Sequence, residues 1–323
     1  DKILEIYFGI SDFLTVFEDL GNDYVIYDTY SEEEGFKVLL FCTDPRRKIG
    51  ECLGLGRASV LFSATMLPVQ YYKGLLGGNA EDYEVYAESV FDPDKRGVFI
   101  ASDVTTRYRD RSEDEYFRTA DHISRIVRPR KGNYMVFFPS YSYMRKVAQI
   151  YEDAFVTPGD TLIAQEESMT EADKEDFLAL FDEEGETDGS SEVSESGSLI
   201  AFCVMGGIFS EGIDLKGDSL IGVICVGPGI PGVDLEHDIL REYFDGYDRM
   251  GYEYAYMYPG MNKVLQAAGR VIRTEEDTGI VVLLDKRFLG TSYRRLFPRE
   301  WTKVKVTDLE HIREYITDFW NKK

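Results

Sequence analysis

Residues 133–155, NYMVFFPSYSYMRKVAQIYEDAF, contain a short apolar run followed by a longer amphipathic one. The run Tyr134–Phe138 has the length of a buried strand. Pro139 ends this run, and Ser140 stands where a helix N-cap is expected, because its hydroxyl can accept a hydrogen bond from the first helical turn. Apolar residues then recur at helical spacing as far as Phe155. The stretch predicts a strand that leads directly into a capped helix.

The same alternation of apolar strand and amphipathic helix continues on both sides of this stretch. It predicts an α/β fold with a doubly wound, mostly parallel sheet and helices on both faces. Ligands of such sheets bind at the carboxyl ends of the strands. The other strands are expected at Ala58–Phe62, Tyr83–Ala87, Gly97–Ala101, Leu199–Val204, Leu220–Val226 and Ile280–Leu284. The other helices are expected at Glu113–Val127, Thr170–Phe181, Leu235–Met250, Met261–Arg273 and Asp308–Asn321.

The first 55 residues have a different pattern. Apolar residues at helical spacing predict a helix over residues 3–20. Two strand-like runs, Tyr24–Thr29 and Phe36–Cys42, flank the turn-type sequence SEEEG and predict a hairpin. Asp44-Pro45 is typical of a helix start, and that helix is expected to run to about Leu55.

The segment Asp182–Ser198 is acidic, rich in Ser and Gly and poor in apolar residues. This composition favours a surface loop. A regulatory or partner-binding segment is the alternative.

The composition excludes several classes of protein. Apolar residues make up 44% of the chain, enough for a core, and no apolar run is long enough to cross a membrane. The net charge of −23 argues against a protein that coats nucleic acid, although it allows a local basic groove. The four cysteines form no CxxC pair, so we expect reduced thiols, no metal site and a cytoplasmic location. The chain opens without Met and without a basic leader, so we expect part of a longer protein that has no signal peptide.

The segment QAAGRVIR (residues 266–273) carries two arginines close to a glutamine. Gln266, Arg270 and Arg273 are spaced four and three apart, so on a helix they would share one face. Gly269 would let that face approach another surface closely. Two converging guanidinium groups suit a phosphate, because each donates hydrogen bonds in a planar fork. The alternative is a pair of surface arginines on an amphipathic helix.

Polar residues also follow the expected strand Leu199–Val204, in the segment FSEGIDL (residues 209–215). Glu211, Gly212 and Asp214 lie where a loop at the carboxyl end of a strand can hold a ribose hydroxyl or a neighbouring backbone. An ordinary turn that contains glycine explains the same residues.

Two other segments combine an apolar run with hydroxyl or aromatic residues. VLFSATMLP (residues 60–68) includes Ser63 and Thr65, which are suited to relaying hydrogen bonds between two sites or to capping a helix. In NYMVFFPSY, Phe137 favours core packing, whereas Tyr141 suits either the core or a base that stacks on its ring.

Taken in order, these segments resemble the C-terminal half of superfamily 2 helicases of the XPD/DinG group. SATMLP resembles motif III, NYMVFFPSYSYM motif IV, FSEGIDL motif V and QAAGRVIR motif VI. GPGIP after the strand Leu220–Val226 and TGIVVLLDKRF after motif VI are similar to the turn and closing strand of that family. The resemblance covers about residues 36–300 and implies a RecA-like domain, the second motor domain of a helicase.

In that family ATP lies between two RecA-like domains, and the first domain holds ATP and Mg²⁺. Neither a Gly-x-x-x-x-Gly-Lys-[Ser/Thr] segment nor a DEAH-type box is present in this chain, so we expect it to hydrolyse no ATP alone. The resemblance implies that Arg273 is the arginine finger, with Arg270 beside it. It also implies that Gln266 senses the nucleotide. Gly269, Glu211, Gly212 and Asp214 would lie at the nucleotide.

The resemblance assigns further residues to coupling and to the nucleic acid. Ser63 and Thr65 would couple hydrolysis to the movement of the two domains. Ser140 and Tyr141 would lie near single-stranded DNA, which the family grips by its phosphates. Arg107 and Arg109 in TTRYRDR are candidate backbone clamps, or else part of a solvated charged segment.

The expected partners are single-stranded DNA and the first helicase domain of the same protein, with no membrane. We expect residues 1–56 to be a remnant of the first domain and of the return from an inserted arch. Residues 57–305 would form the second RecA-like domain, and residues 306–323 a C-terminal helix. An iron–sulfur cluster, found in XPD-like members, would lie in the first domain, so the chain does not reveal whether one is present.

The sequence therefore predicts the C-terminal motor domain of an ATP-dependent 5′→3′ DNA helicase, with the polarity taken from the family. An RNA helicase and a non-catalytic nucleic-acid-binding module derived from a helicase are the alternatives. The intact pair Arg270 and Arg273 argues against the module, because a structural module has no need of both.

Overall fold

The computed structural model describes residues 2–33, 35–181, 197–209, 215 and 219–323. The chain forms two compact units, one from residues 1–85 and 233–255 and the other from residues 86–232 and 256–323. Most of the acidic segment 182–198 and three of the residues expected at the nucleotide, Glu211, Gly212 and Asp214, lie outside the described residues.

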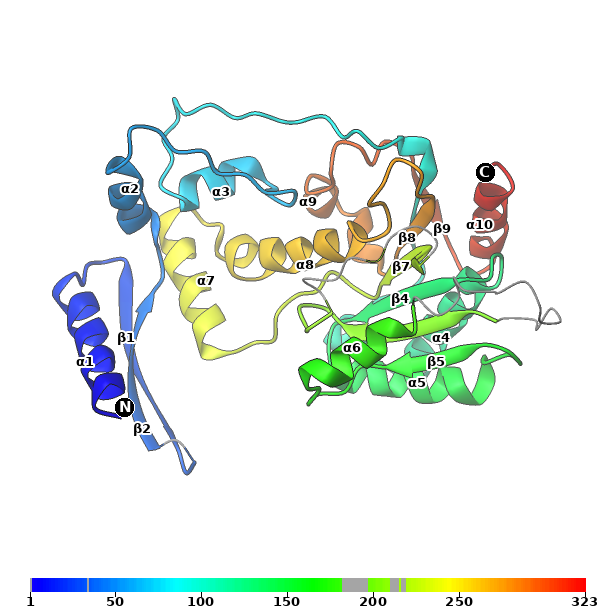
Figure 1. Cartoon of the computed structure of the whole chain (residues 1–323), viewed down its shortest axis with the longest axis horizontal. Helices are drawn as coiled ribbons and strands as arrows, with labels where there is room; N and C mark the ends of the chain where they lie inside the picture. Colours follow the sequence, from blue (N-terminus) through cyan, green and yellow to red (C-terminus); the bar gives the residue numbers. More distant parts are fainter. Residues whose placement is uncertain (1, 34, 182–196, 210–214, 216–218) are drawn as a thin grey trace. The chain divides into compact units, whose positions relative to one another are not determined.

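The larger unit is built on one seven-stranded sheet in which all the neighbouring pairs are parallel (Figure 1). The strand order is β5-β6-β4-β7-β8-β3-β9. This arrangement confirms the predicted doubly wound α/β fold of the RecA-like type. The strands are β3 (Arg96–Ala101), β4 (Asn133–Phe138), β5 (Thr161–Ala164), β6 (Leu199–Val204), β7 (Gly222–Cys225), β8 (Gly279–Leu283) and β9 (Val304–Thr307).

Helices cover both faces of this sheet. α4 (Glu113–Val127), α5 (Tyr141–Ala154) and α10 (Ile312–Trp320) contribute to one apolar core with alternate residues of the strands. α8 (Tyr258–Ala268) packs against β7 and lies outside that core, on the opposite face (Figure 1). Other helical segments described in this unit are α6 (Glu171–Ala179), α9 (Thr291–Arg294), η1 (Pro93–Lys95), η2 (Tyr108–Asp110) and η6 (Lys286–Leu289).

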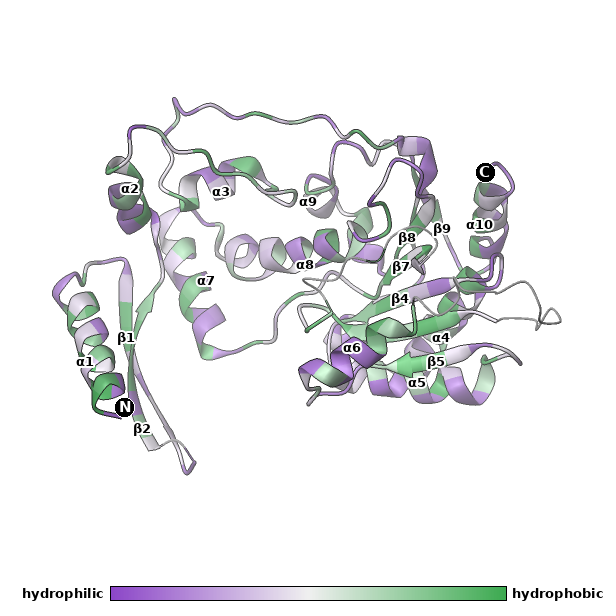
Figure 2. Ribbon diagram, viewed as in Figure 1, coloured by the Kyte–Doolittle hydropathy of each residue, from purple (hydrophilic) through white to green (hydrophobic). Residues whose placement is uncertain are grey.

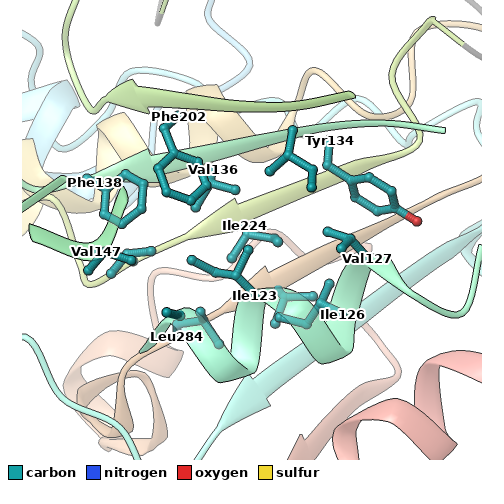
Figure 3. Packing of buried hydrophobic residues seen from close by; sticks show 14 of the residues in the cluster. Ile123, Ile126, Val127, Tyr134, Val136, Phe138, Val147, Phe202, Ile224 and Leu284 are labelled. Atoms are coloured by element: carbon teal, nitrogen blue, oxygen red, sulfur yellow. The ribbon is translucent and has the colours of Figure 1, made fainter. Parts of the chain in front are cut away.

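The core explains why these strands are apolar throughout. Figure 3 shows Ile123, Ile126 and Val127 of α4 facing side chains of several strands, among them Val136 and Phe202. Figure 2 shows the strands of this sheet mostly in the hydrophobic colour. A parallel sheet buried on both faces has no solvent side, so its strands carry continuous apolar runs.

The smaller unit has an antiparallel hairpin of β1 (Tyr24–Ser31) and β2 (Gly35–Cys42), in which Tyr24 pairs with Cys42. The predicted hairpin is therefore confirmed. Its helices are α1 (Lys2–Glu18), α2 (Arg46–Gly54), α3 (Val69–Leu75) and α7 (Leu235–Tyr247), and the π-helical segment η5 (Glu253–Met257) follows α7. α7 joins the N-terminal residues through Tyr243, whose hydroxyl donates to Asp44 Oδ2 at 3.0 Å.

Two predicted strands were wrong. Ala58–Phe62 and Tyr83–Ala87 form no helix or strand and belong to neither sheet of the described residues. Val60 is 84% exposed and Tyr83 98% exposed. A strand needs a neighbour to bond its backbone, and these apolar runs find none within the described parts of the chain.

Two short strands that the sequence did not reveal, β5 and β9, lie at the sheet edges. Strands of this length carry little periodic signal. The domain boundaries expected after residues 56 and 305 stay a prediction about the longer protein. No helix of the described residues is long and apolar enough to span a membrane.

Candidate functional site

The carboxyl ends of the seven strands meet at one edge of the sheet, because all of the strands are parallel. The loops that follow β3, β4, β5, β6 and β8 therefore emerge at this edge, which we call the carboxyl edge. Of the candidate residues from the sequence, Ser140, Tyr141, Arg107 and Arg109 follow strands that end at this edge, whereas the loop that carries Arg273 leads into the start of β8.

Ser140 and Tyr141 lie directly after β4. The Ser140 hydroxyl accepts a hydrogen bond from Tyr143 N at 3.3 Å, which confirms the predicted N-cap of α5. The Tyr141 ring is half-buried, and its hydroxyl accepts a hydrogen bond from Gln165 Nε2 at 2.7 Å. Phe137 is fully buried, as expected for a core residue.

Gln165, which the sequence analysis missed, connects three elements at this edge. Its side chain is buried, and Oε1 accepts a hydrogen bond from Val204 N at 2.9 Å. Its backbone N–H donates to Phe202 O at 2.8 Å, and Nε2 reaches Tyr141. Gln165 thus joins the end of β5 to the end of β6 and to the start of α5. The signal for it was a glutamine at the end of the short apolar run Thr161–Ala164.

The turn after β6 leads to the segment that resembles motif V. Gly206 has a φ of +76°, a conformation that favours glycine. Phe209 is fully buried, and its ring stacks on Phe177 at 4.3 Å between centroids. This packing fixes where the segment begins. The roles proposed for Glu211, Gly212 and Asp214 stay predictions.

The segment that resembles motif VI is only partly helical. α8 ends at Ala268, with Gly269 as its C-cap, so the expectation that Gln266, Arg270 and Arg273 share one helical face was wrong. The chain turns inward after Gly269: Arg270 N donates to Ala267 O at 3.2 Å in a tighter turn. The physical reason is that the chain must return to start β8 at Gly279. Gly269 is exposed, with an ordinary helical φ of −66°.

The two arginines of this segment have different surroundings. Arg270 is buried and lies near Cys203 of β6. Burial raises the pKa of the Cys203 thiol, and the charge of Arg270 opposes that rise. Arg273 is exposed, on the loop between α8 and β8. Arg270 is therefore held at the sheet, and Arg273 projects from it.

Asp277 organises the loop that carries Arg273. Its carboxylate is buried and accepts hydrogen bonds from Arg273 N at 2.7 Å, Thr274 N at 2.8 Å and Thr274 Oγ1 at 2.6 Å. Three donors on one carboxylate fix the backbone on either side of Arg273. The sequence analysis did not single out Asp277, because its partners are found only in the folded loop.

The loop after β3 carries Arg107 and Arg109, both exposed. Its base is fixed by Asp285, which is fully buried and accepts hydrogen bonds from Thr106 N at 2.7 Å and Thr106 Oγ1 at 2.9 Å. Arg287 also donates to Asp285, through Nε at 3.0 Å and Nη2 at 2.7 Å. The exposed arginines therefore project from a rigid base beside β8.

Ser63 and Thr65 belong to the smaller unit. Thr65 N donates to Ser63 Oγ at 3.2 Å, and the two hydroxyls lie 3.4 Å apart. The two hydroxyls therefore interact with each other, as a turn of Ser and Thr commonly allows. Their coupling role stays a prediction.

Among the described residues, no group of three or more His, Cys, Asp or Glu side chains is arranged to hold a metal ion. Guanidinium groups such as those of Arg270 and Arg273 suit phosphate oxygens.

The all-parallel sheet with helices on both faces is of the RecA-like type. A family model described as "Helicase C-terminal domain" matches residues 123–304, more than half of the chain, and the chain belongs to this family. The resemblance to the XPD group of superfamily 2 is thereby confirmed.

Similar proteins support this assignment. The chain is 29% identical to the ATP-dependent DNA helicase XPD of Sulfolobus acidocaldarius over 244 residues, which cover 73% of this chain and 40% of that protein. It is 26% identical to the regulator of telomere elongation helicase 1 of Bos taurus, covering 91% of this chain and 26% of that protein. The chain therefore spans less than half the length of these relatives.

Solved structures show the same fold. One described as "XPD_Helicase" superimposes with a TM-score of 0.62 at 22% identity, covering 89% of this chain and 48% of the other. A second, described as "XPD_APO", gives a TM-score of 0.61 at 22% identity, covering 93% of this chain and 57% of the other.

Proposed function

We propose that this chain is the C-terminal motor domain of an ATP-dependent 5′→3′ DNA helicase and supplies the arginine finger, Arg273. The observation that carries the proposal is the loop between α8 and β8. It presents Arg273 in an exposed position, on a backbone fixed by the buried carboxylate of Asp277, in the loop that leads into β8 of the parallel sheet. Relatives named as ATP-dependent DNA helicases support the class of reaction.

The chemistry follows from charge. Negative charge shifts onto the phosphate oxygens as the terminal phosphoryl group of ATP is transferred, so a guanidinium across the cleft stabilises the transition state more than bound ATP. Arg270, held near β6, would support the same phosphate, and Gln266 in the last turn of α8 would contact the nucleotide. ATP and Mg²⁺ would be held by a first motor domain, because this chain lacks the phosphate-cradling and DEAH-type segments.

Single-stranded DNA would cross the carboxyl edge of the larger unit. Tyr141 and the N-cap Ser140 would lie near it, and Arg107 and Arg109 project from a rigid base in position to contact phosphates. Because the net charge is −23, we expect binding by this chain alone to be weak and strongly salt-dependent. Replacing both Arg107 and Arg109 with Ala should reduce the salt slope by about 0.7 for each phosphate that is no longer neutralised. An unchanged slope would remove these residues from the DNA path.

The smaller unit supports a partner domain. α1 has no buried residue, and Phe8 is 58% and Phe62 89% exposed. Apolar surface on this scale is typical of an interface. We propose that the first motor domain of the same protein covers it, with Ser63 and Thr65 in the coupling segment.

The test of this function is Arg273→Ala in the full-length protein. The turnover number for ATP should fall about 10³- to 10⁵-fold while nucleotide affinity stays nearly unchanged, because the finger acts on the transition state. Arg273→Lys should restore little, since an ammonium lacks the planar fork. Arg313→Ala, which removes an exposed arginine of α10, is the matched control.

Steady-state hydrolysis on single-stranded DNA, beside equilibrium binding of a fluorescent ATP analogue, measures both quantities. A rise in the Michaelis constant without loss of turnover would contradict the assignment, and Arg270 would be the next candidate.

A further inference from the structure

Lys263 lies on α8, three residues before Gln266, and its side chain crosses two turns at the carboxyl edge. A Cβ atom added to Gly206, in the turn after β6, would lie 2.9 Å from Lys263 Cε and 3.2 Å from Nζ. A Cβ atom added to Gly229, in the turn after β7, would lie 3.5 Å from Lys263 Cβ. The ammonium group therefore lies beside the turn that follows β6.

Two glycines create the space that the lysine occupies. Gly206 and Gly229 have φ values of +76° and +62°, which side-chain-bearing residues rarely adopt. At Gly229 an added Cβ atom would also lie 2.9 Å from Gly260 O and 2.9 Å from Met205 Sδ. The close approach of α8 to the two turns thus depends on glycine. This approach holds the aliphatic part of the Lys263 side chain against the carboxyl edge.

The Lys263 side chain is half-buried. Burial lowers the pKa of this lysine. No carboxylate of the described residues forms an ion pair with it to offset that effect. By contrast, the ammonium of Lys73 lies 2.9 Å from Glu84 Oε1. A half-buried cation without a counter-ion costs free energy, which an external anion would recover.

The neighbours of the turn after β6 are also hydrogen-bonding groups of the candidate site. A Cβ atom added to Gly207 would lie 2.8 Å from Gln165 Nε2, the same amide that donates to the Tyr141 hydroxyl. Lys263 and Tyr141 therefore flank one turn, with Gln165 between them. This continuity places the ammonium on the same edge as the proposed path of the DNA.

We propose that the Lys263 ammonium binds a phosphate oxygen of the ligand that crosses the carboxyl edge beside β6. The shared chemistry is a phosphate, either the phosphodiester of single-stranded DNA or a phosphate of the nucleotide. The inference rests on the proposed function and adds a cationic group separate from Arg270 and Arg273.

The experiment uses three variants of the full-length protein. Lys263→Met keeps the apolar stem and removes the charge, Lys263→Arg keeps the charge, and Lys322→Met removes an exposed lysine as a control. A fluorescein-labelled oligothymidylate is titrated by anisotropy at several salt concentrations, and a fluorescent ATP analogue with Mg²⁺ is titrated without DNA. Thermal unfolding checks that each variant is folded.

If the phosphate belongs to DNA, Lys263→Met weakens oligothymidylate binding about tenfold and reduces the salt slope by about 0.7. If it belongs to the nucleotide, the analogue binds about tenfold more weakly and the DNA slope stays unchanged. In either case Lys263→Arg retains most of the affinity, and Lys322→Met matches wild type.

If the wild-type protein binds a probe and Lys263→Met binds it equally well, the assignment of Lys263 is wrong, but the proposed function is not affected. The assignment is also wrong if Lys263→Arg and Lys263→Met are both folded and bind the probe equally weakly, because the charge would then not contribute to binding. A wild-type protein that binds neither probe would overturn the proposed function itself.

Discussion

The two units of this chain differ in how far their apolar side chains are exposed to solvent. The larger unit encloses them: Phe202 and Val136 are fully buried between the sheet and its helices. The smaller unit exposes them, since Ile3 is 84% and Val60 84% exposed. The comparison teaches that the larger unit has its own core, whereas the smaller one leaves exposed the apolar surface that we propose a partner domain covers.

A second comparison uses the same short motif in both units. Asp44-Pro-Arg46 and Asp285-Lys-Arg287 each form a fork in which the arginine backbone and guanidinium donate to the aspartate. The side chains of Asp285 and Arg287 are 0% and 13% exposed. Those of Asp44 and Arg46 are 9% and 27% exposed. The same hydrogen-bonded arrangement of aspartate and arginine therefore occurs once in the interior and once in a partly exposed position.

The largest expected effect tests the first comparison. Phe202→Ala should lower the free energy of unfolding by about 3–5 kcal/mol, because it leaves a cavity in a packed core. Phe8→Ala in α1 should change it by less than about 0.5 kcal/mol, because the ring is 58% exposed. Urea titrations followed by circular dichroism measure both. A similar cost for the two variants would mean that α1 is packed in solution, and the contrast between the units would fail.

An intermediate effect tests the second comparison. Asp285→Ala should lower the free energy of unfolding by about 3 kcal/mol, since it removes a buried carboxylate that accepts hydrogen bonds from Arg287 and Thr106. Asp44→Ala should cost about 1–2 kcal/mol, because Arg46 stays partly in water and over the Tyr247 ring at 4.3 Å. The same titrations compare the pair. If Asp44→Ala proves the more costly, burial does not set the strength of these forks.

The smallest effect sharpens the account of the carboxyl edge. Gln165→Ala should cost about 1–2 kcal/mol, because Val204 N loses its buried acceptor. Tyr141→Phe removes the hydrogen bond from Gln165 Nε2 but keeps the one from Val204 N to Gln165 Oε1. It should therefore lower the free energy of unfolding by less. Hydrogen exchange at Val204 distinguishes the two variants. Faster exchange in Gln165→Ala but not in Tyr141→Phe is expected, and equal protection in all forms would remove Gln165 as the link between these strands.

Local signals in the sequence predicted most of the fold. Ser140 gave the start of α5, and the continuous apolar run of β4 indicated a strand buried on both faces. Both signals lie within a few residues of the element they define. The parallel sheet followed from their alternation along the chain.

Other features depend on contacts between distant parts of the chain. The run Ala58–Phe62 reads as a strand but has no partner among the described residues. α8 ends at Ala268, with Gly269 as its C-cap, and the chain then turns towards the start of β8. Gln165 and Asp277 acquire their meaning from partners on other elements or in a folded loop. Local sequence patterns do not reveal such contacts. For this reason the prediction extended the helix to Arg273 and placed Gln266, Arg270 and Arg273 on one face, although α8 ends at Ala268.

The order of the strands also bears on how the larger unit folds during synthesis. β3 comes first in the sequence of this sheet, yet both of its neighbours, β8 and β9, come last. Closing such a long loop is slow, because its entropy is lost before any pairing compensates. The bonds from Thr106 to Asp285 span 179 residues and form only after β8 has emerged from the ribosome. The loop with Arg107 and Arg109 therefore acquires its anchored base among the last events of folding, so a nascent chain arrested before β8 lacks the anchor for these arginines.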